Sequence, residues 1–214
     1  DETSASVCID GKVINNIIAT QSVHKDYGGV VPELASRAHQ KNIVTVIHST
    51  LNDAQITFDD LSAIAVTQGP GLLGALIVGY SYAQSLSYAL NIPLINVHHM
   101  KAHILANFID DPKPNFPFLC LTVSGGHTQI IKVIGPLEMI ELGNTIDDAV
   151  GEAFDKGAKL LGFPYPGGPF IDKYAKKGDS NRFQFAESNV SGLNFSFSGI
   201  KTSLLYFLKD QQKH

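Results

Sequence analysis

Several residue types are scarce in this chain of 214 residues, and their scarcity excludes whole classes of protein. It has no tryptophan and two cysteines, Cys8 and Cys120. Two cysteines are too few for a small secreted scaffold held together by disulfides. Both lie in apolar, strand-like segments, so we expect buried free thiols in a protein of a reducing compartment.

Long apolar runs and an excess of positive charge are also missing. No run reaches the roughly 20 apolar residues of a membrane-spanning helix. The first residues, Asp-Glu-Thr-Ser, include neither a basic region nor an apolar signal core. We therefore expect a cytoplasmic protein with no membrane partner. The net charge of −4 gives no overall electrostatic footprint for nucleic acid, so an RNA partner needs other evidence.

Residues 98–107 carry two histidines, His99 and His103, after an apolar run at 92–97. The alanines, leucine and methionine around them favour a helix, on which residues four apart share one face. Two imidazoles side by side suit a zinc or iron site that still needs a third ligand. The alternative is a pair of partly buried histidines that hydrogen-bond locally. A zinc protease has glutamate directly after its first histidine, and Met100 cannot replace that base.

The first third of the chain predicts a β-hairpin and a long helix. Strand-like residues between 4 and 20 flank Asp10-Gly11, a strong signal for a two-residue turn. Pro32 suits the first turn of a helix, which we expect to continue to about Leu51. A buried strand is expected at 63–67.

Residues 69–74, Gly-Pro-Gly-Leu-Leu-Gly, stand between that strand and an apolar helix expected at about 73–90. They match the dinucleotide-binding pattern G-x-G-x-x-G. That pattern also needs an acidic residue about 20 positions later to hold the ribose, and residues 90–101 contain none. We therefore favour a tight loop with close helix packing over an NAD site.

A proline-rich segment at 110–117 predicts a boundary between two domains, residues 1–113 and 114–214. The second domain restarts with strands expected at 118–123 and 128–134. The turn between them, Ser-Gly-Gly-His-Thr, offers backbone N–H groups and hydroxyls that could hold an anion. The alternative is an ordinary Gly-Gly hairpin turn.

Three further segments of the second domain carry candidate residues. A helix is expected at 147–161, with the acidic residues at 148, 152 and 155 on one face. Such a cluster usually faces solvent, and a ribose or metal site is the alternative. Tyr-Pro-Gly-Gly-Pro at 165–169 opens a helix that carries Asp172, a natural place for a base or phosphate. Residues 191–202 lead into a last helix.

Six ordered motifs resemble the TsaD family, the tRNA N6-adenosine threonylcarbamoyltransferases formerly classed as O-sialoglycoprotein endopeptidases. They are DYGGVVPELASR (26–37), GPGLLGAL (69–76), HHMKAH (98–103), SGGHT (124–128), GEAFDK (151–156) and YPGGP (165–169). The resemblance implies an α/β fold of the actin/Hsp70/sugar-kinase superfamily, with two ribonuclease-H-like lobes around a nucleotide cleft and the second lobe incomplete here.

The resemblance also implies a reaction. The threonylcarbamoyl group would pass from threonylcarbamoyl-AMP to N6 of adenosine 37 in tRNAs that read codons beginning with A. The expected cofactor is one divalent metal per subunit, iron or zinc, and the nucleotide is this adenylate or ATP. Bacterial members work with the TsaB and TsaE proteins. The amine can attack the activated carbonyl directly, so no covalent enzyme nucleophile is needed.

Site residues follow from the resemblance position by position, and no catalytic residue is assigned. His99 and His103 match the metal ligands, and Asp1 and Glu2 match an acidic pair on the phosphate side. The expected contacts to the nucleotide-side substrate are Thr122, Val123, Ser124, Gly125, Gly126, Asp155, Gly168 and Asp172.

The chain departs from the family in three places. Lys101 stands where the family's H-x-E-x-H motif often has glutamate, so any help from that group is absent or replaced. We expect the strand before the first motif to be missing. We also expect the C-terminal segment to be missing, with its third metal ligand, an aspartate, and a nucleotide-contacting asparagine. Such a fragment should not be fully active alone.

Two other functions stay open. A metal-dependent O-sialoglycoprotein endopeptidase would need a general base beside the metal. A non-catalytic nucleotide-binding scaffold would have no need for the pair of histidines that this chain retains.

Overall fold

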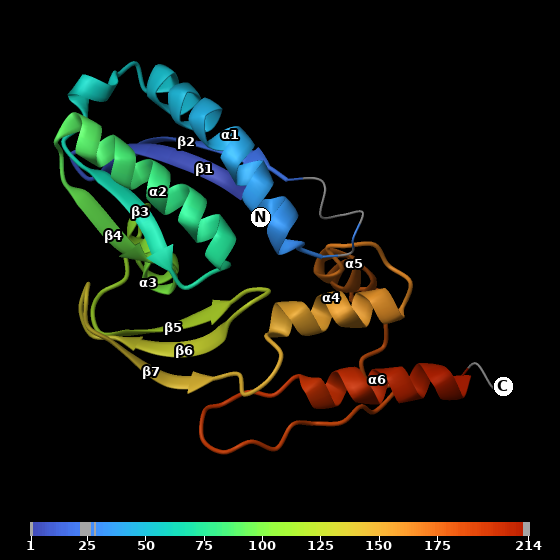
Figure 1. The fold of residues 1–214 in the computed structure, drawn as a ribbon. Coiled ribbons are helices and arrows are strands. Elements are labelled where there is room, and N and C mark those ends of the chain that lie inside the picture. Colours follow the sequence, from blue (N-terminus) through green and yellow to red (C-terminus); the bar gives the residue numbers. More distant parts are fainter. Residues whose placement is uncertain (1, 22–26, 28, 212–214) are drawn as a thin grey trace. The chain divides into compact units, whose positions relative to one another are not determined.

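The computed structural model describes residues 2–21, 27 and 29–211 (Figure 1). The chain divides into two compact units, Asp1–Lys113 and Pro114–His214. Each unit combines strands with helices, so the expected mixed α/β class is confirmed. Within the described residues, no helix is both long and apolar enough to cross a membrane.

The first unit opens with the predicted hairpin. Strands β1 (Glu2–Ile9) and β2 (Lys12–Thr20) pair antiparallel. Asp10 and Gly11 both have positive φ, of 49° and 76°, as a tight two-residue hairpin turn requires. The following helix α1 (Pro32–Asp53) begins at Pro32 as predicted.

Strand alternation along β1 corrects one expectation. Thr3 and Val7 are buried and Thr3 Oγ1 lies 2.8 Å from His39 Nδ1 on α1, whereas Cys8 is exposed. The predicted burial of Cys8 is therefore wrong, because successive side chains of a strand point to opposite faces. Both cysteines are free, as predicted, and Cys120 is half-buried.

A strand–helix–strand motif completes the main part of the first unit. Strands β3 (Ile64–Gly69) and β4 (Leu94–His98) pair in parallel through helix α2 (Leu73–Leu90). Helices α1 and α2 lie side by side over the strands (Figure 1). Gly74 supports the predicted close packing, because a Cβ there would collide with the Ser36 hydroxyl on α1.

Short elements stand before and after these two strands in the chain. The one-turn helix η2 (Phe58–Asp60) carries a capping box between Thr57 and Asp60. Helix α3 (His99–Leu105) and the turn η3 (Ala106–Phe108) follow β4 directly.

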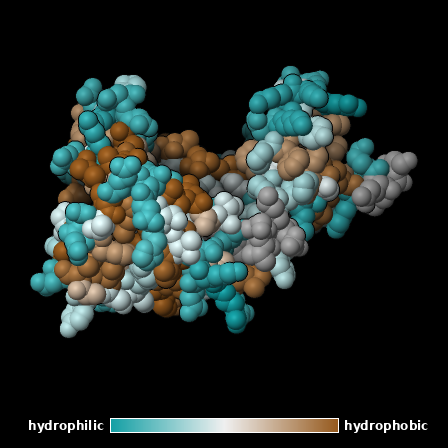
Figure 2. Space-filling view, turned by 90° about the horizontal axis from the view of Figure 1, so that it is seen from above, coloured by the Kyte–Doolittle hydropathy of each residue, from teal (hydrophilic) through white to brown (hydrophobic). Residues whose placement is uncertain are grey.

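Large apolar side chains remain exposed in the first unit. The hairpin and strands β3–β4 form two separate two-stranded sheets. Ile18 on β2 is 54% exposed, and Leu73 on α2 is 72% exposed. Brown apolar residues accordingly lie open between teal hydrophilic ones on the molecular surface (Figure 2).

The second unit has an antiparallel sheet of β5 (Phe118–Val123), β6 (Thr128–Val133) and β7 (Met139–Asn144) in that order. The sequence prediction missed β7, because its apolar residues do not alternate cleanly and a helix follows closely. Three helices come next: α4 (Val150–Leu160), α5 (Gly168–Ala175) and α6 (Ser198–Gln211). Helix α4 packs against both α5 and α6.

Candidate functional site

The two histidines of the metal hypothesis lie together on α3. His99 Nε2 and His103 Nε2 are 3.2 Å apart, with their rings at 77°. This contact is the local hydrogen bond of the alternative interpretation. Two nitrogens this far apart, each about 2.1 Å from one zinc ion, would subtend about 100° at the metal, which is near the tetrahedral angle. The donor set therefore fits two ligands of one metal. The described residues contain no group of three or more His, Cys, Asp or Glu side chains that could complete it.

The turn between β5 and β6 is closed by its own serine. The Ser124 hydroxyl accepts hydrogen bonds from the N–H groups of Gly126 (3.3 Å) and His127 (3.0 Å). Gly125 and Gly126 are exposed, and Val123 is 55% exposed. The predicted Gly-Gly turn therefore forms, with its glycine backbone at the surface.

Thr122 stands out at the base of this turn. Its Oγ1 is buried and has no hydrogen-bond partner among the described residues. A buried hydroxyl without a partner costs about 1–3 kcal/mol. This hydroxyl therefore keeps an unused hydrogen-bonding capacity beneath the turn.

Helix α4 begins directly on this turn. The Gly151 N–H donates to the Ser124 carbonyl (3.2 Å), and the Val150 N–H donates to Thr128 Oγ1 (2.9 Å). A Cβ on Gly151 would lie 2.6 Å from the Ser124 oxygen and 2.8 Å from the Gly125 nitrogen. Glycine at 151 is thus what lets the helix approach the turn backbone.

Asp155, one turn further along α4, holds the second glycine turn. Its Oδ1 accepts from the N–H of Gly167 (2.7 Å) and of Gly168 (3.3 Å). Any Cβ on Gly167 would collide with the Ala158 side chain. The structure therefore gives Asp155 a positioning role toward Gly168, at the start of α5.

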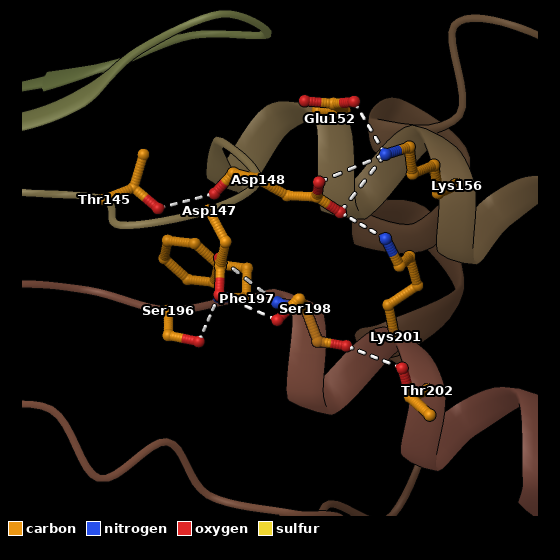
Figure 3. A network of polar contacts seen from close by, with 10 residues as sticks. All are labelled: Thr145, Asp147, Asp148, Glu152, Lys156, Ser196, Phe197, Ser198, Lys201 and Thr202. Carbon is orange, nitrogen blue, oxygen red and sulfur yellow. Dashed lines mark hydrogen bonds and ion pairs between the residues drawn. The ribbon is translucent and has the colours of Figure 1, made fainter.

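A polar network ties α4 to α6, and the sequence prediction missed it (Figure 3). Asp147 accepts hydrogen bonds from the hydroxyls of Ser196 (2.5 Å) and Ser198 (2.7 Å) and from the N–H of Phe197 (2.8 Å). It therefore caps the N-terminus of α6. Ser196, just before this helix, and Ser198, its first residue, were the available signal, since such residues favour helix starts.

Asp148 sits between two lysines in the same network. Lys201 Nζ of α6 is 2.6 Å from one carboxylate oxygen, and Lys156 Nζ of α4 is 3.2 Å from the other. Lys156 also pairs with Glu152 at 2.7 Å. The acidic face predicted for α4 is therefore split: Asp148 and Glu152 bind lysines, whereas Asp155 binds the glycine turn.

These contacts shift the acidity of the groups involved. The hydrogen bond from Lys201 holds the pKa of Asp148 below its usual value, and Lys156 adds to this effect. Burial acts to raise the pKa of Asp147, but hydrogen bonds from Ser196, Phe197 and Ser198 outweigh it, and the pKa lies far below the usual value. Glu152 raises the pKa of Lys156. Asp147, Asp148 and Lys156 are therefore charged at neutral pH.

Asp172, Glu2 and Asp1 complete the set of predicted residues. Asp172 is on α5, 69% exposed, and pairs with Lys176 at 2.8 Å. Glu2 is exposed at the start of β1, and Asp1 lies outside the described residues.

The chain is similar to known proteins over its whole length. Residues 12–212 match the family model described as TsaD: tRNA N6-adenosine threonylcarbamoyltransferase. The enzyme of that name from Christiangramia forsetii is 62% identical over 217 residues, which cover 100% of this chain and 64% of the relative. The one from Cytophaga hutchinsonii is 59% identical, covering 98% and 61%. The chain thus spans under two thirds of the length of these relatives.

A looser likeness links the chain to a solved structure, YeaZ from Pseudomonas aeruginosa. The identity is 16% and the TM-score 0.44, over 64% of this chain and 58% of the other. The family match is far stronger, and it confirms the resemblance predicted from the six motifs. The chain belongs to the TsaD family.

Proposed function

We propose that the full-length protein transfers the threonylcarbamoyl group of threonylcarbamoyl-AMP to N6 of adenosine 37 in tRNAs that read codons beginning with A. Membership of the TsaD family supports this proposal. The observation that carries it is the gathering of two glycine turns on α4. Gly151 meets the Ser124 turn and Asp155 holds the Gly168 turn.

The nucleotide side of the substrate would bind at these two turns. The exposed glycine backbone at 125 and 126 lets a ligand approach closely, and Thr122 Oγ1 supplies a buried hydrogen-bonding group. Gly168 begins α5 with its N–H bonded to Asp155, and it is proposed as a substrate contact because a glycine lets a ligand approach the backbone closely. Val123 and Asp172 are exposed and are proposed as contacts at the edge of this site. Asp1 and Glu2 are proposed on the phosphate side.

His99 and His103 would hold one iron or zinc ion, because their Nε2 atoms are spaced as two ligands of one metal. Bound there, the metal supplies Lewis-acid polarisation of a phosphate or carbonyl oxygen. His98 is the N-cap of α3, and its Nδ1 accepts a hydrogen bond from the Lys101 N–H (3.5 Å). The helix therefore begins at His99, the first histidine of the pair. Lys101 is not assigned a catalytic role.

The reaction needs positioning more than a nucleophile from the protein. The N6 amine of the adenosine attacks the carbonyl carbon of the mixed anhydride, a C–N bond forms and the C–O bond to phosphate breaks. AMP leaves, and the amine proton passes to solvent or to the phosphate. Rigid turns that hold the adenylate in line can supply much of the acceleration, since oriented reactants gain large effective concentrations.

The endopeptidase alternative is less well supported by the site. Met100 is 7% exposed and occupies the position next to the first histidine. It cannot serve as the base that activates water.

A matched set of proteins tests the proposal. We expect the full-length wild type to hold about one iron or zinc per chain and to release AMP from threonylcarbamoyl-AMP when unmodified tRNA is added. His99→Ala/His103→Ala should lose the metal, whereas His48→Ala, at an exposed histidine of α1, should keep it. AMP release without any dependence on tRNA, or cleavage of a sialoglycoprotein by wild type, would contradict the proposal.

Further features of the family are proposed with this function. Each unit would be a ribonuclease-H-like lobe of the actin/Hsp70/sugar-kinase superfamily. TsaB and TsaE are proposed as protein partners, and ATP as a second adenine nucleotide. The cytoplasm is the proposed location.

A further inference from the structure

Positive charge is concentrated in one segment of a chain that is acidic overall. The chain carries a net charge of −4, whereas residues 159–182 contain five basic and two acidic residues. All five basic side chains are exposed: Lys159, Lys173, Lys176, Lys177 and Arg182. The segment is thus locally cationic and exposed, which the net charge alone conceals.

Most of this charge is available to a partner. Lys176 pairs with Asp172, but both are about 70% exposed, and such surface pairs contribute little. Within the described residues no ion pair involves Lys159, Lys173 or Lys177. Lys173 and Lys177 are four residues apart, so they lie on one side of α5 and the turn that follows it.

Aromatic rings lie beside these lysines. Phe163 stacks on Phe170 (5.9 Å between centroids, 10° between planes) and on Tyr174 (5.1 Å, 18°). Phe163 is therefore the middle ring, and Tyr174, which is 51% exposed, ends the stack. Phe170 and Tyr174 are four residues apart on α5, so they share one side of this helix, and Lys173 directly precedes Tyr174. The stack is preorganised, with a ring open to an additional planar group.

We infer that the surface of α5 and the turn after it, made of Lys173, Tyr174 and Lys177, binds single-stranded RNA next to the nucleotide turn. Lysines neutralise phosphates, and exposed aromatic rings stack on unpaired bases. Gly168, proposed to contact the adenylate, opens the same helix α5. The inference rests on the proposed function. It adds the place where the anticodon loop of the substrate tRNA is held.

RNA binding by the full-length protein tests the surface. A fluorescein-labelled anticodon stem-loop with unmodified adenosine 37 is titrated by anisotropy at several KCl concentrations. Lys173→Gln/Lys177→Gln should raise Kd at least about 10-fold and flatten the slope of log Kd against log salt by about 1.4, or about 0.7 per phosphate contact. Lys12→Gln/Lys41→Gln, which removes the same charge from exposed sites in the first unit, should change neither.

Tyr174 gives a second variant that does not depend on charge. Tyr174→Leu should weaken binding of the stem-loop roughly 5- to 150-fold, with little effect on a fully paired duplex, because base stacking requires an aromatic face. Tyr174→Phe should restore binding. Equal melting temperatures for the leucine and phenylalanine variants show that lost binding is not lost folding.

The outcomes separate this inference from the proposed function. RNA affinity unchanged in both the lysine and tyrosine variants overturns the inference, including when wild type still modifies tRNA. Unchanged RNA affinity with lost binding of a protein partner overturns it too, because the surface would then dock protein. RNA binding through these residues by a wild type that releases no AMP upholds the surface and refutes the proposed transfer.

Discussion

Gly151 offers the sharpest test of the packing between α4 and the Ser124 turn. The substitution Gly151→Ala places a Cβ 2.6 Å from the Ser124 oxygen, a backbone atom with no rotamer to escape to. Ordinary contact begins near 3.4 Å, so the turn must move by about 0.8 Å. Overpacking of this kind costs about 1–3 kcal/mol, and we expect a loss of unfolding free energy of that size.

A second glycine supplies the control. Gly79 is inside α2 with no atom within 4 Å of an added Cβ. Gly79→Ala should therefore stabilise the protein by about 0.5–1 kcal/mol, because alanine loses less backbone entropy in a helix. Urea unfolding of the two variants should give shifts of opposite sign.

The same displacement should reach the proposed substrate site. A misplacement near 1 Å in a reacting group can cost about 100-fold in rate. We expect Gly151→Ala to slow tRNA-dependent AMP release about 10- to 100-fold, with Gly79→Ala at the wild-type rate. Equal stability and equal rates in the two variants would refute the view that α4 supports the turn.

Two further predictions concern the network between α4 and α6. Because the pKa of Asp147 is lowered, its contribution to stability is present above the ordinary aspartate pKa near 3.9 and is lost as pH falls below that value toward the lowered pKa. Asp147→Ala should cost about 1–2 kcal/mol at pH 7, and its unfolding free energy in urea should fall less steeply than that of wild type between about pH 5 and 2. An unchanged pH dependence would contradict the cap. Lys201→Met should lower the unfolding free energy in urea by about 1–2 kcal/mol, because its partner Asp148 is only 17% exposed. The control Lys176→Met, at an exposed pair, should lower it by less than about 1 kcal/mol. Equal losses would show that Lys201 contributes no more than a surface pair.

Local signals in the sequence predicted the elements that depend on neighbouring residues. Asp10-Gly11 needs only its own backbone to turn, and Pro32 needs only its fixed φ to start a helix. The spacing of His99 and His103 likewise predicted their shared helical face. Each of these features is decided within about four residues of chain.

Long-range contacts could not be predicted in this way. Asp147 accepts from residues 49–51 positions later, and no periodicity links such partners. Asp155 was predicted as a residue of the candidate site, but its hydrogen bonds to Gly167 and Gly168 cross a turn whose path the sequence leaves open. Tertiary contacts decide the roles of these residues, whereas the local pattern only indicates where they stand.

The meeting of separate chain segments on α4 has a thermodynamic consequence. A ligand that binds only when the Ser124 turn is docked on Gly151 lowers the population of states in which α4 is undocked. Since the amides of Gly167 and Gly168 are bonded to the same helix through Asp155, their hydrogen exchange should slow even if the ligand never touches them. If a ligand at the Ser124 turn raises the affinity of a second molecule for the Gly168 turn, that molecule raises the affinity of the ligand by the same factor. Helix α4 thus couples the stability of the Ser124 turn to that of the Gly168 turn.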